Sequence, residues 1–486
     1  MPVRWRCSTT WDWEIASRRS SRMPRQYLSL SPSPGGAMST NGLPSPSDAI
    51  PVLLISQNDF EQALRELLFS KYSIGPEYRT ELVALEQDET DVTAAIRHAD
   101  GTIEKNVYPW VVGCDGVHSF VRNAAGIKFE GGKVAVMSMM DVPLTNVTFD
   151  GRWMNYYFNK DLFMNCTKMP GKYWRIYMSE PTGQYVFAPD QRKAYQEVAD
   201  KLGIGFKVGK PHWQTAWDVR NNIAEKYRNG RMIICGDASH VHSPSGGQGM
   251  NGCMQDAFNL GWKIAAVLKG QADDFILDTY EKERKPIDSQ ISKGAMATHE
   301  IVMGFGIPPE ERRHLTKEPD WEWRAINLVS GLSHNYRDVA NVPAGLTAVP
   351  GPQAGERAPD ARHLVEPKRR LYDAFRRPQF TVLVAPGTTA PDDVIDIGTK
   401  VRDQLNRLFP GQVSTYLISK QHDPRFDFDH KSEDELDEFT TRYEIGPEGR
   451  LVLVRPDLYV GMACQPKEWE AVAKYMTQWF IPQGMT

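Results

Sequence analysis

The sequence lacks the features of a membrane protein, a disulfide-rich secreted protein or a nucleic-acid-binding protein. It has no run of about eighteen apolar residues, which a membrane-spanning helix needs, and no apolar signal-peptide core near its start. Its six cysteines form no Cys-x-x-Cys pair, so we expect a reducing, cytoplasmic setting. No metal site is expected, because no segment has metal-ligand spacing with a matching partner motif. The net charge of −4 implies no general affinity for nucleic acid.

The composition is that of an ordinary globular protein, and the length of 486 residues favours about three domains. The most informative stretch is 231–270. An apolar strand at Met232–Cys235 runs into Gly236-Asp237, a glycine-rich loop and a long helix. Gly236 permits a sharp turn, Asp237 offers an acceptor to a sugar or polyol hydroxyl, and the positive end of the helix faces the loop. This order predicts a site for a phosphorylated cofactor.

The loop and the helix add detail to this prediction. Glycine has no Cβ, so backbone N–H groups can approach a ligand closely at Gly246, Gly247 and Gly249. Apolar residues at helical spacing predict one core-facing side of the helix, formed by Met250, Met254, Ala257, Phe258, Gly261, Ile264, Ala265 and Leu268. Spacing alone leaves open a plain strand–loop–helix unit that binds no ligand.

The identities of the residues in this stretch are more specific than their spacing. GDASHVHSPSGGQGMN followed by DAFNLGWKIA closely resembles the second FAD fingerprint of the class A flavoprotein monooxygenases, the group of para-hydroxybenzoate hydroxylase and phenol hydroxylase. The resemblance implies that Asp237 binds the ribityl chain of FAD and that Pro244 lies near the reactive edge of the flavin. The implied cofactor residues of this segment are Gly236, Asp237, Gly246, Gly247, Gln248, Gly249, Met250 and Asn251. Backbone donors among them favour negative charge on the reduced ring and on the C4a-hydroperoxide, whereas we interpret His240 and His242 as loop packing.

A second match lies upstream, in VVGCDGVHSFVRNAAG at 111–126. A short apolar strand ends at a turn, and a helix begins at Ser119. The segment resembles the family motif DGxxSxxR, which is filled here by Asp115, Gly116, Ser119 and Arg122. The resemblance implies contact with the FAD pyrophosphate region and assistance to NAD(P)H. Taken alone, the residues leave open that Asp115 only forms a turn and that Arg122 is a surface cation.

Two further segments resemble the family more weakly. Gln57 ends a strand before a helix that we expect Asn58 to cap, and the family has a glutamine there that contacts the flavin. The apolar face of this helix, predicted to be core, comprises Phe60, Ala63, Leu64, Leu67 and Leu68. Tyr280–Pro286 resembles the family segment YExERxP, and we interpret its charges as a solvated face.

The first FAD fingerprint, GxGxxG after an N-terminal strand, is missing from the sequence. Residues 1–50 are rich in arginine, serine and proline and show no strand–helix pattern. We interpret them as disordered, as a transit peptide or as mistranslated non-coding sequence. The expectation is that the N-terminal half of the FAD domain is absent and that the chain binds FAD weakly or not at all. Two alternatives to an aromatic hydroxylase therefore remain. One is an inactive remnant that acts as an interaction module, and the other is a flavin oxidase or Baeyer–Villiger-type oxygenase.

The middle of the chain predicts four antiparallel strands, at Val134–Val142, Trp153–Phe158, Leu162–Lys168 and Tyr173–Ser179. By resemblance this sheet covers an aromatic substrate above the flavin. A phenol must lose its proton to become electron-rich, and in WDVRNNIAEKY the aligned family arginine is replaced by Asn222. Asp218 and Arg220 are the candidates that remain for this task.

The C-terminal part, entered at AGERAPDA, resembles the thioredoxin-like domain that relatives use for structure or dimer formation. Its predicted elements are strands at Gln379–Ala385, Val413–Ser419 and Arg450–Arg455 and helices at Val401–Phe409 and Trp469–Trp479.

The predicted fold class is α/β, with an incomplete Rossmann-like FAD domain, an inserted and mostly antiparallel β-sheet substrate domain, and the C-terminal thioredoxin-like domain. The expected boundaries are 1–50 (no domain), 51–130 and 221–345 (FAD domain), 131–220 (substrate domain) and 346–486. The predicted function is a monooxygenase that uses FAD, NAD(P)H and molecular oxygen to hydroxylate a small phenolic compound. No nucleic acid or membrane partner is expected, and a homodimer is possible.

Overall fold

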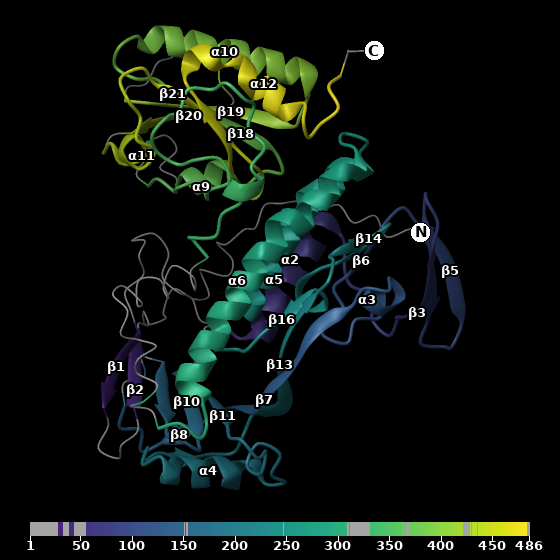
Figure 1. The fold of residues 1–486 in the computed structure, drawn as a ribbon, viewed down its shortest axis with the longest axis vertical. Coiled ribbons are helices and arrows are strands. Elements are labelled where there is room, and N and C mark those ends of the chain that lie inside the picture. Colours follow the sequence, from purple (N-terminus) through teal and green to yellow (C-terminus); the bar gives the residue numbers. More distant parts are fainter. Residues whose placement is uncertain are drawn as a thin grey trace. The chain divides into compact units, whose positions relative to one another are not determined.

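The structure is a computed structural model. It describes residues 28–32, 38–42, 55–149, 151, 154–245, 247–308, 311, 331–362, 364–365, 370–420, 428, 430–434 and 436–483. The chain divides into two compact units. The N-terminal unit comprises Asp12–Met254 with Asp288–Gly331, and the C-terminal unit comprises Gln255–Ile287 with Leu332–Thr486. Each unit is described by itself below, and Figure 1 labels the helices and strands.

The N-terminal unit is built on an eight-stranded antiparallel sheet with the order β1-β2-β9-β10-β11-β7-β13-β16. The four predicted strands are confirmed as β7 (Phe129–Val142), β9 (Asn155–Phe158), β10 (Phe163–Lys168) and β11 (Trp174–Ser179). β13 (Trp213–Ala224) pairs with β7 along its length, with a bulge between Val219 and Arg220, and carries β16 (His240–Val241) on its other side. A short pair, β8 (Leu144–Thr145) and β12 (Lys207–Val208), lies beside it.

Helix α4 (Gln191–Lys201) covers one face of this sheet (Figure 1). Asp190 caps the helix by accepting from the backbone N–H of Lys193. The buried side of α4 presents Tyr195 and Val198 to Met140 and Ile176 of the sheet. Alternate residues of the strands therefore form a core beneath α4.

The first fifty residues contain two strands that sequence analysis did not predict. β1 (Leu28–Pro32) and β2 (Met38–Gly42) form an antiparallel hairpin, and β2 adds to the sheet through Met38 opposite Phe158 of β9. The expectation that this region has no strand pattern was wrong at these positions. Serine and proline content hid the strands because edge strands tolerate proline, as at Pro32. The rest of residues 1–50 lies outside the described residues.

Two smaller sheets complete the N-terminal unit. One is antiparallel, with the order β3-β4-β5 (Glu81–Gln87, Val92–Arg97 and Ile103–Tyr108). The other has the order β14-β15-β6 (Arg228–Asn229, Met232–Ile234 and Val111–Gly113), and within it β15 and β6 run parallel.

Helix α2 (Gln57–Tyr72) corrects two predictions. Ser56, not Asn58, is its N-cap, because the Ser56 side chain accepts from the backbone N–H of Asp59. No residue of α2 is buried, so the apolar face predicted to be core is half-exposed. The apolar residues of α2 have the predicted helical spacing, but spacing does not reveal whether other elements pack against that side of the helix.

The C-terminal unit has a six-stranded mixed sheet with the order β17-β20-β19-β18-β21-β22. The predicted strands are confirmed as β18 (Phe380–Ala385), β19 (Val413–Ser419) and β21 (Arg450–Val454), joined by β17 (Leu364–Val365), β20 (His430–Asp434) and β22 (Val460–Cys464). The helices are α9 (Leu371–Ala374), α10 (Pro391–Leu408), α11 (Glu438–Arg442) and α12 (Glu470–Met476). α10 connects the parallel strands β18 and β19 and begins ten residues before the predicted helix, with Pro391 in its first turn.

Helices α5 (Gly249–Leu268) and α6 (Asp278–Met303) each contribute residues to both units. The predicted apolar face of α5 was wrong, since Met250, Ala257 and Leu268 are exposed. The buried side carries polar residues instead, among them Asp256, Asn259 and Lys263. The prediction of a solvated face at Tyr280–Pro286 was also wrong, because Glu283 and Arg284 are buried.

Candidate active site

The parallel pair β6–β15 brings the two sequence motifs together. Val111 lies opposite Met232 and Gly113 opposite Ile234, and the N–H of Cys235 donates to the carbonyl of Gly113 at 2.9 Å. Parallel strands end at the same edge of a sheet, which is where ligands bind in α/β folds. The turns that carry Asp115 and Asp237 therefore leave from one carboxyl edge.

Arg122 joins these two turns. Its Nη1 donates to the carbonyl of Ala238 at 2.9 Å and its Nη2 to the carbonyl of Val117 at 2.8 Å. The guanidinium lies 3.9 Å from the centre of the Phe129 ring, and the residue is only 5% exposed. Burial lowers the pKa of Arg122, with Asp115 opposing that shift. The alternative that Arg122 is a surface cation is wrong; it fastens the Gly236–Ala238 turn to the upstream motif.

Asp115 and Ser119 organise the start of α3 (Phe120–Ala124). Ser119 is the N-cap and accepts from the backbone N–H of Arg122 at 2.9 Å. Asp115 accepts from the Ser119 hydroxyl and from the backbone N–H of Val121. Gly116 adopts a φ of +78°, and a Cβ there would meet nothing within 4 Å. The motif thus forms a closed turn with open space beside its glycine.

The turn after β15 forms as predicted. Gly236 has a φ of +66°, and a Cβ there would lie 3.1 Å from the Cβ of Cys253 in the first turn of α5. Asp237 is exposed, and its Oδ1 accepts from the Cys253 thiol at 3.3 Å. Cys253 was not among the predicted site residues, because a single cysteine in a helix gives no sequence signal of this contact.

The glycine-rich loop leaves room for a flat ligand. Gly247 has a φ of +66°, and neither Gly247 nor Gly249 would place a Cβ within 4 Å of a described atom. Gln248 is buried, Met250 is 41% exposed, and Asn251 Nδ2 donates to the carbonyl of Gly247 at 3.2 Å. Gly246 lies outside the described residues. The open glycine surface and the exposed Asp237 carboxylate fit the ring and the ribityl hydroxyls of FAD.

The two histidines of the motif are packed together. His240 and His242 stack at 6.4 Å between ring centres, and His240 Nε2 lies 3.5 Å from Oδ2 of buried Asp288. His242 Nδ1 contacts the carbonyl of Ser243 at 2.9 Å, and burial lowers the pKa of His242. Pro244, two residues after His242 in the sequence, is half-buried.

The remaining candidates lie on other elements. Gln57, in the first turn of α2, donates to Glu61 of the same helix at 2.8 Å. On β13, exposed Asp218 forms an ion pair with Lys133 at 2.8 Å, and Arg220 is half-buried beyond the bulge. Asn222 is 7% exposed and pairs with Val241 of β16. Its Nδ2 donates to the carbonyl of Phe129, while Oδ1 has no hydrogen-bond partner among the described residues.

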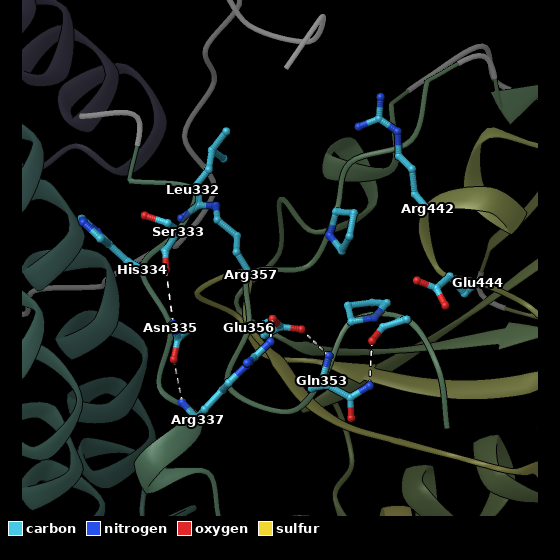
Figure 2. Close-up of a pocket in the computed structure, with 13 residues that line it drawn as sticks. Leu332, Ser333, His334, Asn335, Arg337, Gln353, Glu356, Arg357, Arg442 and Glu444 are labelled. Atoms are coloured by element: carbon cyan, nitrogen blue, oxygen red, sulfur yellow. Dashed lines mark hydrogen bonds and ion pairs between the residues drawn. The ribbon is translucent and has the colours of Figure 1, made fainter. Parts of the chain in front are cut away.

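A pocket of about 430 Å³ lies elsewhere, within the C-terminal unit. Two of the three arginines that line it are in ion pairs, Arg337 with Glu356 and Arg442 with Glu438. Figure 2 shows Arg442 on the opposite side of the pocket from Arg337. None of the residues predicted to bind FAD lines this pocket.

Comparison with known proteins identifies the family of the chain. Residues 39–295 match the family model described as FAD binding domain. The chain is 38% identical over 412 residues to pentachlorophenol 4-monooxygenase of Sphingobium chlorophenolicum, which covers 84% of this chain and 75% of that protein. It is 33% identical over 299 residues to 6-methylpretetramide 4-monooxygenase of Streptomyces rimosus, which covers 59% of this chain and 53% of that protein.

The fold also matches a solved structure. The crystal structure of the flavin-dependent monooxygenase PieE in complex with FAD and substrate superposes with a TM-score of 0.73 at 22% identity, covering 96% of this chain and 89% of PieE. Within the part of the chain that the structure describes, no helix is long and apolar enough to cross a membrane. Because of the family match over residues 39–295 and the 38% identity to pentachlorophenol 4-monooxygenase, the chain belongs to the class A flavin monooxygenases, the FAD-dependent aromatic hydroxylases.

Proposed function

We propose that this chain hydroxylates a small phenolic compound with NAD(P)H and molecular oxygen as co-substrates. The proposal rests on one observation. The turns that contain Asp115 and Asp237 lie at the same carboxyl edge of the β6–β15 pair, and the hydrogen bond from Arg122 to the carbonyl of Ala238 links them. The 38% identity to a protein named for its action on pentachlorophenol supports a phenol as the substrate class.

In this proposal Asp237 accepts hydrogen bonds from ribityl hydroxyls, and the loop around Gly247 offers backbone N–H groups to the flavin ring. The Arg122–Ala238 bond holds the turn in place. Bound FAD would supply the redox chemistry, passing the two electrons of NAD(P)H to molecular oxygen, of which one atom enters the substrate and the other leaves as water. The protein holds the flavin ring and the substrate in the relative position that the reaction needs and excludes water from the site.

The substrate must also be activated. Asp218 and Arg220 of β13 remain the proposed groups, and the unpartnered Oδ1 of Asn222 on the same strand is a further acceptor for a phenolic O–H. A phenol that gives up its proton becomes more electron-rich at the carbon to be hydroxylated.

The C-terminal unit is proposed to contain a thioredoxin-like domain that serves structure or dimer formation. The support is the order β18-α10-β19 followed by the hairpin β21-β22 and α12. The sequence has no Cys-x-x-Cys pair, so thiol–disulfide exchange is not part of the proposal. A reducing, cytoplasmic location is proposed on the same ground.

The test is to purify the full chain, measure bound FAD by absorbance, and assay phenol-stimulated NADPH oxidation and hydroxylated product. Stoichiometric FAD and product support the hydroxylase, FAD with only hydrogen peroxide supports an oxidase, and absence of bound FAD would contradict the proposal.

A matched pair of variants tests the role of Asp237. Asp237→Ala is expected to lose most bound FAD, because the turn then offers no carboxylate to the ribityl chain. Asp396→Ala, which removes an exposed aspartate on α10, serves as the control and should retain FAD. Equal flavin content in the two variants would refute the assigned role.

A further inference from the structure

A buried chain of hydrogen bonds in the N-terminal unit connects α6 to the start of the glycine-rich loop. Its members are Ser243, Ser245 and His299, whose exposed fractions are 0%, 7% and 6%. The Ser243 hydroxyl oxygen lies 2.9 Å from His299 Nδ1 and 3.1 Å from Ser245 Oγ. All three residues belong to the same compact unit. We name them the Ser–His chain.

The hydrogen bonds of the Ser–His chain have one direction. The Ser243 hydroxyl donates to Ser245 Oγ. Because a serine hydroxyl has a single hydrogen, the contact between Ser243 and His299 must use the N–H of His299 Nδ1 as its donor. Burial lowers the pKa of His299, which keeps the ring neutral with that one N–H. Donation therefore runs from His299 through Ser243 to Ser245.

The Ser–His chain ends on a donor that the protein does not use. Ser245 Oγ accepts from Ser243, and the hydroxyl hydrogen of Ser245 has no acceptor among the described residues. Leaving a buried hydroxyl hydrogen unpaired costs free energy, so this donor indicates a ligand atom that accepts. Each donor in a chain polarises the next and strengthens the last bond. An oxygen that carries negative charge is the acceptor best matched to such a donor.

Both ends of the Ser–His chain adjoin parts of the proposed site. Ser245 is two residues before Gly247, at the open glycine surface. His299 is one helical turn before Val302 on α6, and Val302 packs in a buried cluster with Phe163 of β10, on the face of the sheet away from α4. The chain therefore joins the glycine-rich loop to the part of α6 that meets this face of the sheet.

We propose that the Ser245 hydroxyl donates a hydrogen bond to the phenolate oxygen of the substrate, and that His299 is a positioning residue that acts through Ser243. The inference rests on the proposed hydroxylation of a phenol and adds that the site recognises the anionic form. A donor to a phenolate stabilises the charged form, so it lowers the pKa of the bound phenol. The phenolic proton leaves to another acceptor, and the Ser–His chain keeps its own hydrogens.

The titratable side chains around the Ser–His chain leave the titration of a bound phenol interpretable. Burial lowers the pKa of His299 and of His242, whose Nδ1 contacts the carbonyl of Ser243 at 2.9 Å. Both rings are therefore neutral at and above neutral pH. Asp288, also on α6, lies 3.5 Å from His240 Nε2. None of these groups is removed by a substitution at Ser245, so a changed pKa of the phenol reports the lost donor.

The test uses the full chain and para-nitrophenol, whose phenolate absorbs visible light. Equilibrium dialysis measures its binding, absorbance across a pH series gives the pKa of the bound phenol, and a separate titration gives FAD affinity. The variants are Ser245→Ala, His299→Leu and His299→Asn, in which the asparagine amide replaces the Nδ1 donor. Ser70→Ala is the control, because Ser70 is exposed on α2 and donates to the carbonyl of Leu67 in the same helix.

Ser245→Ala should raise the pKa of the bound phenol by about 1 to 2 and weaken phenolate binding by about 10- to 100-fold. FAD affinity should stay unchanged, and Ser70→Ala should match the unmodified chain in every measurement. His299→Leu should change the pKa in the same direction by a smaller amount, and His299→Asn should restore it because the donor to Ser243 is present again.

An unchanged pKa of the bound phenol in Ser245→Ala would overturn the proposal, as would failure of the unmodified chain to bind para-nitrophenol. Loss of FAD affinity in Ser245→Ala without a change in that pKa would overturn it too, since the donor would then belong to the flavin. Equal effects of His299→Leu and His299→Asn would remove the positioning role. Absence of hydroxylated product would contradict the proposed function, whereas the titration decides the role of Ser245 without turnover.

Discussion

Gly236 and Gly247 form a natural pair of sites for separating backbone strain from packing. Both adopt a φ of +66°. A Cβ at Gly236 would lie 3.1 Å from Cβ and 3.2 Å from Sγ of Cys253, whereas a Cβ at Gly247 would meet nothing within 4 Å. Alanine at either position suffers the same backbone strain and restricts the unfolded chain equally, so the two substitutions differ in packing alone.

The magnitudes follow from this difference. A left-handed conformation costs a residue with a Cβ about 1 to 2 kcal/mol, which is the whole expected loss for Gly247→Ala. Overpacking against Cys253 adds about 1 to 3 kcal/mol for Gly236→Ala. For a unit of this size that extra loss corresponds to roughly 2 to 12 °C in the unfolding midpoint. Gly247→Ala should instead weaken FAD binding, because its Cβ enters the space proposed for the ring.

The assay is thermal unfolding of the full chain, followed by near-UV circular dichroism, together with FAD titration of each variant. Cys253→Gly removes both close contacts, so in its background Gly236→Ala should cost no more than Gly247→Ala does in the original chain. Equal midpoints for the two alanine variants in the original chain would refute the packing argument. Unchanged FAD affinity in Gly247→Ala would refute the proposed location of the ring.

Two other predictions concern buried charge. Arg122→Lys keeps the positive charge but cannot reach both carbonyls, Ala238 and Val117; we expect a lower thermal midpoint and weaker FAD binding, and unchanged values would contradict its bridging role. Burial, with Arg284 and Arg357 adding to it, lowers the pKa of His334 from 6.5 to about 3. Between these values only the unfolded chain binds the proton, so stability should fall as pH drops below about 6.5. His334→Gln should reduce that fall in urea denaturation, and an unaltered pH dependence would disprove the assignment.

The local parts of the site could be predicted from sequence because short-range chemistry specifies them. The apolar residues before Gly236 form β15, and the positive φ of Gly236 is one that glycine adopts readily. Ser119 begins α3 as expected of an N-cap serine. The parallel contact between Gly113 and Ile234 then joins the two local motifs in one sheet.

The burial of charged helical residues could not be predicted in this way. Glu283 and Lys263 carry the residue types of a solvated helix surface, and nothing near them in sequence indicates otherwise. Their burial depends on Arg455, which is 172 residues from Glu283. The same limit explains α2, whose apolar spacing was recognised although its surroundings were not. Sequence periodicity identifies faces, but long-range partners decide which face is covered.

The pairing of β6 with β15 has a consequence for how such a protein can change over evolution. The chain leaves the carboxyl edge at Gly113 and returns to it at Ile234, on a strand hydrogen-bonded to the one it left. Most of the large antiparallel sheet, from β7 to β13, belongs to an excursion whose two ends are already joined. Substitutions, insertions or deletions within residues 129–224 can therefore reshape this sheet without moving the turns at Asp115 and Asp237. One redox edge can in this way be inherited intact while the range of accepted molecules diversifies.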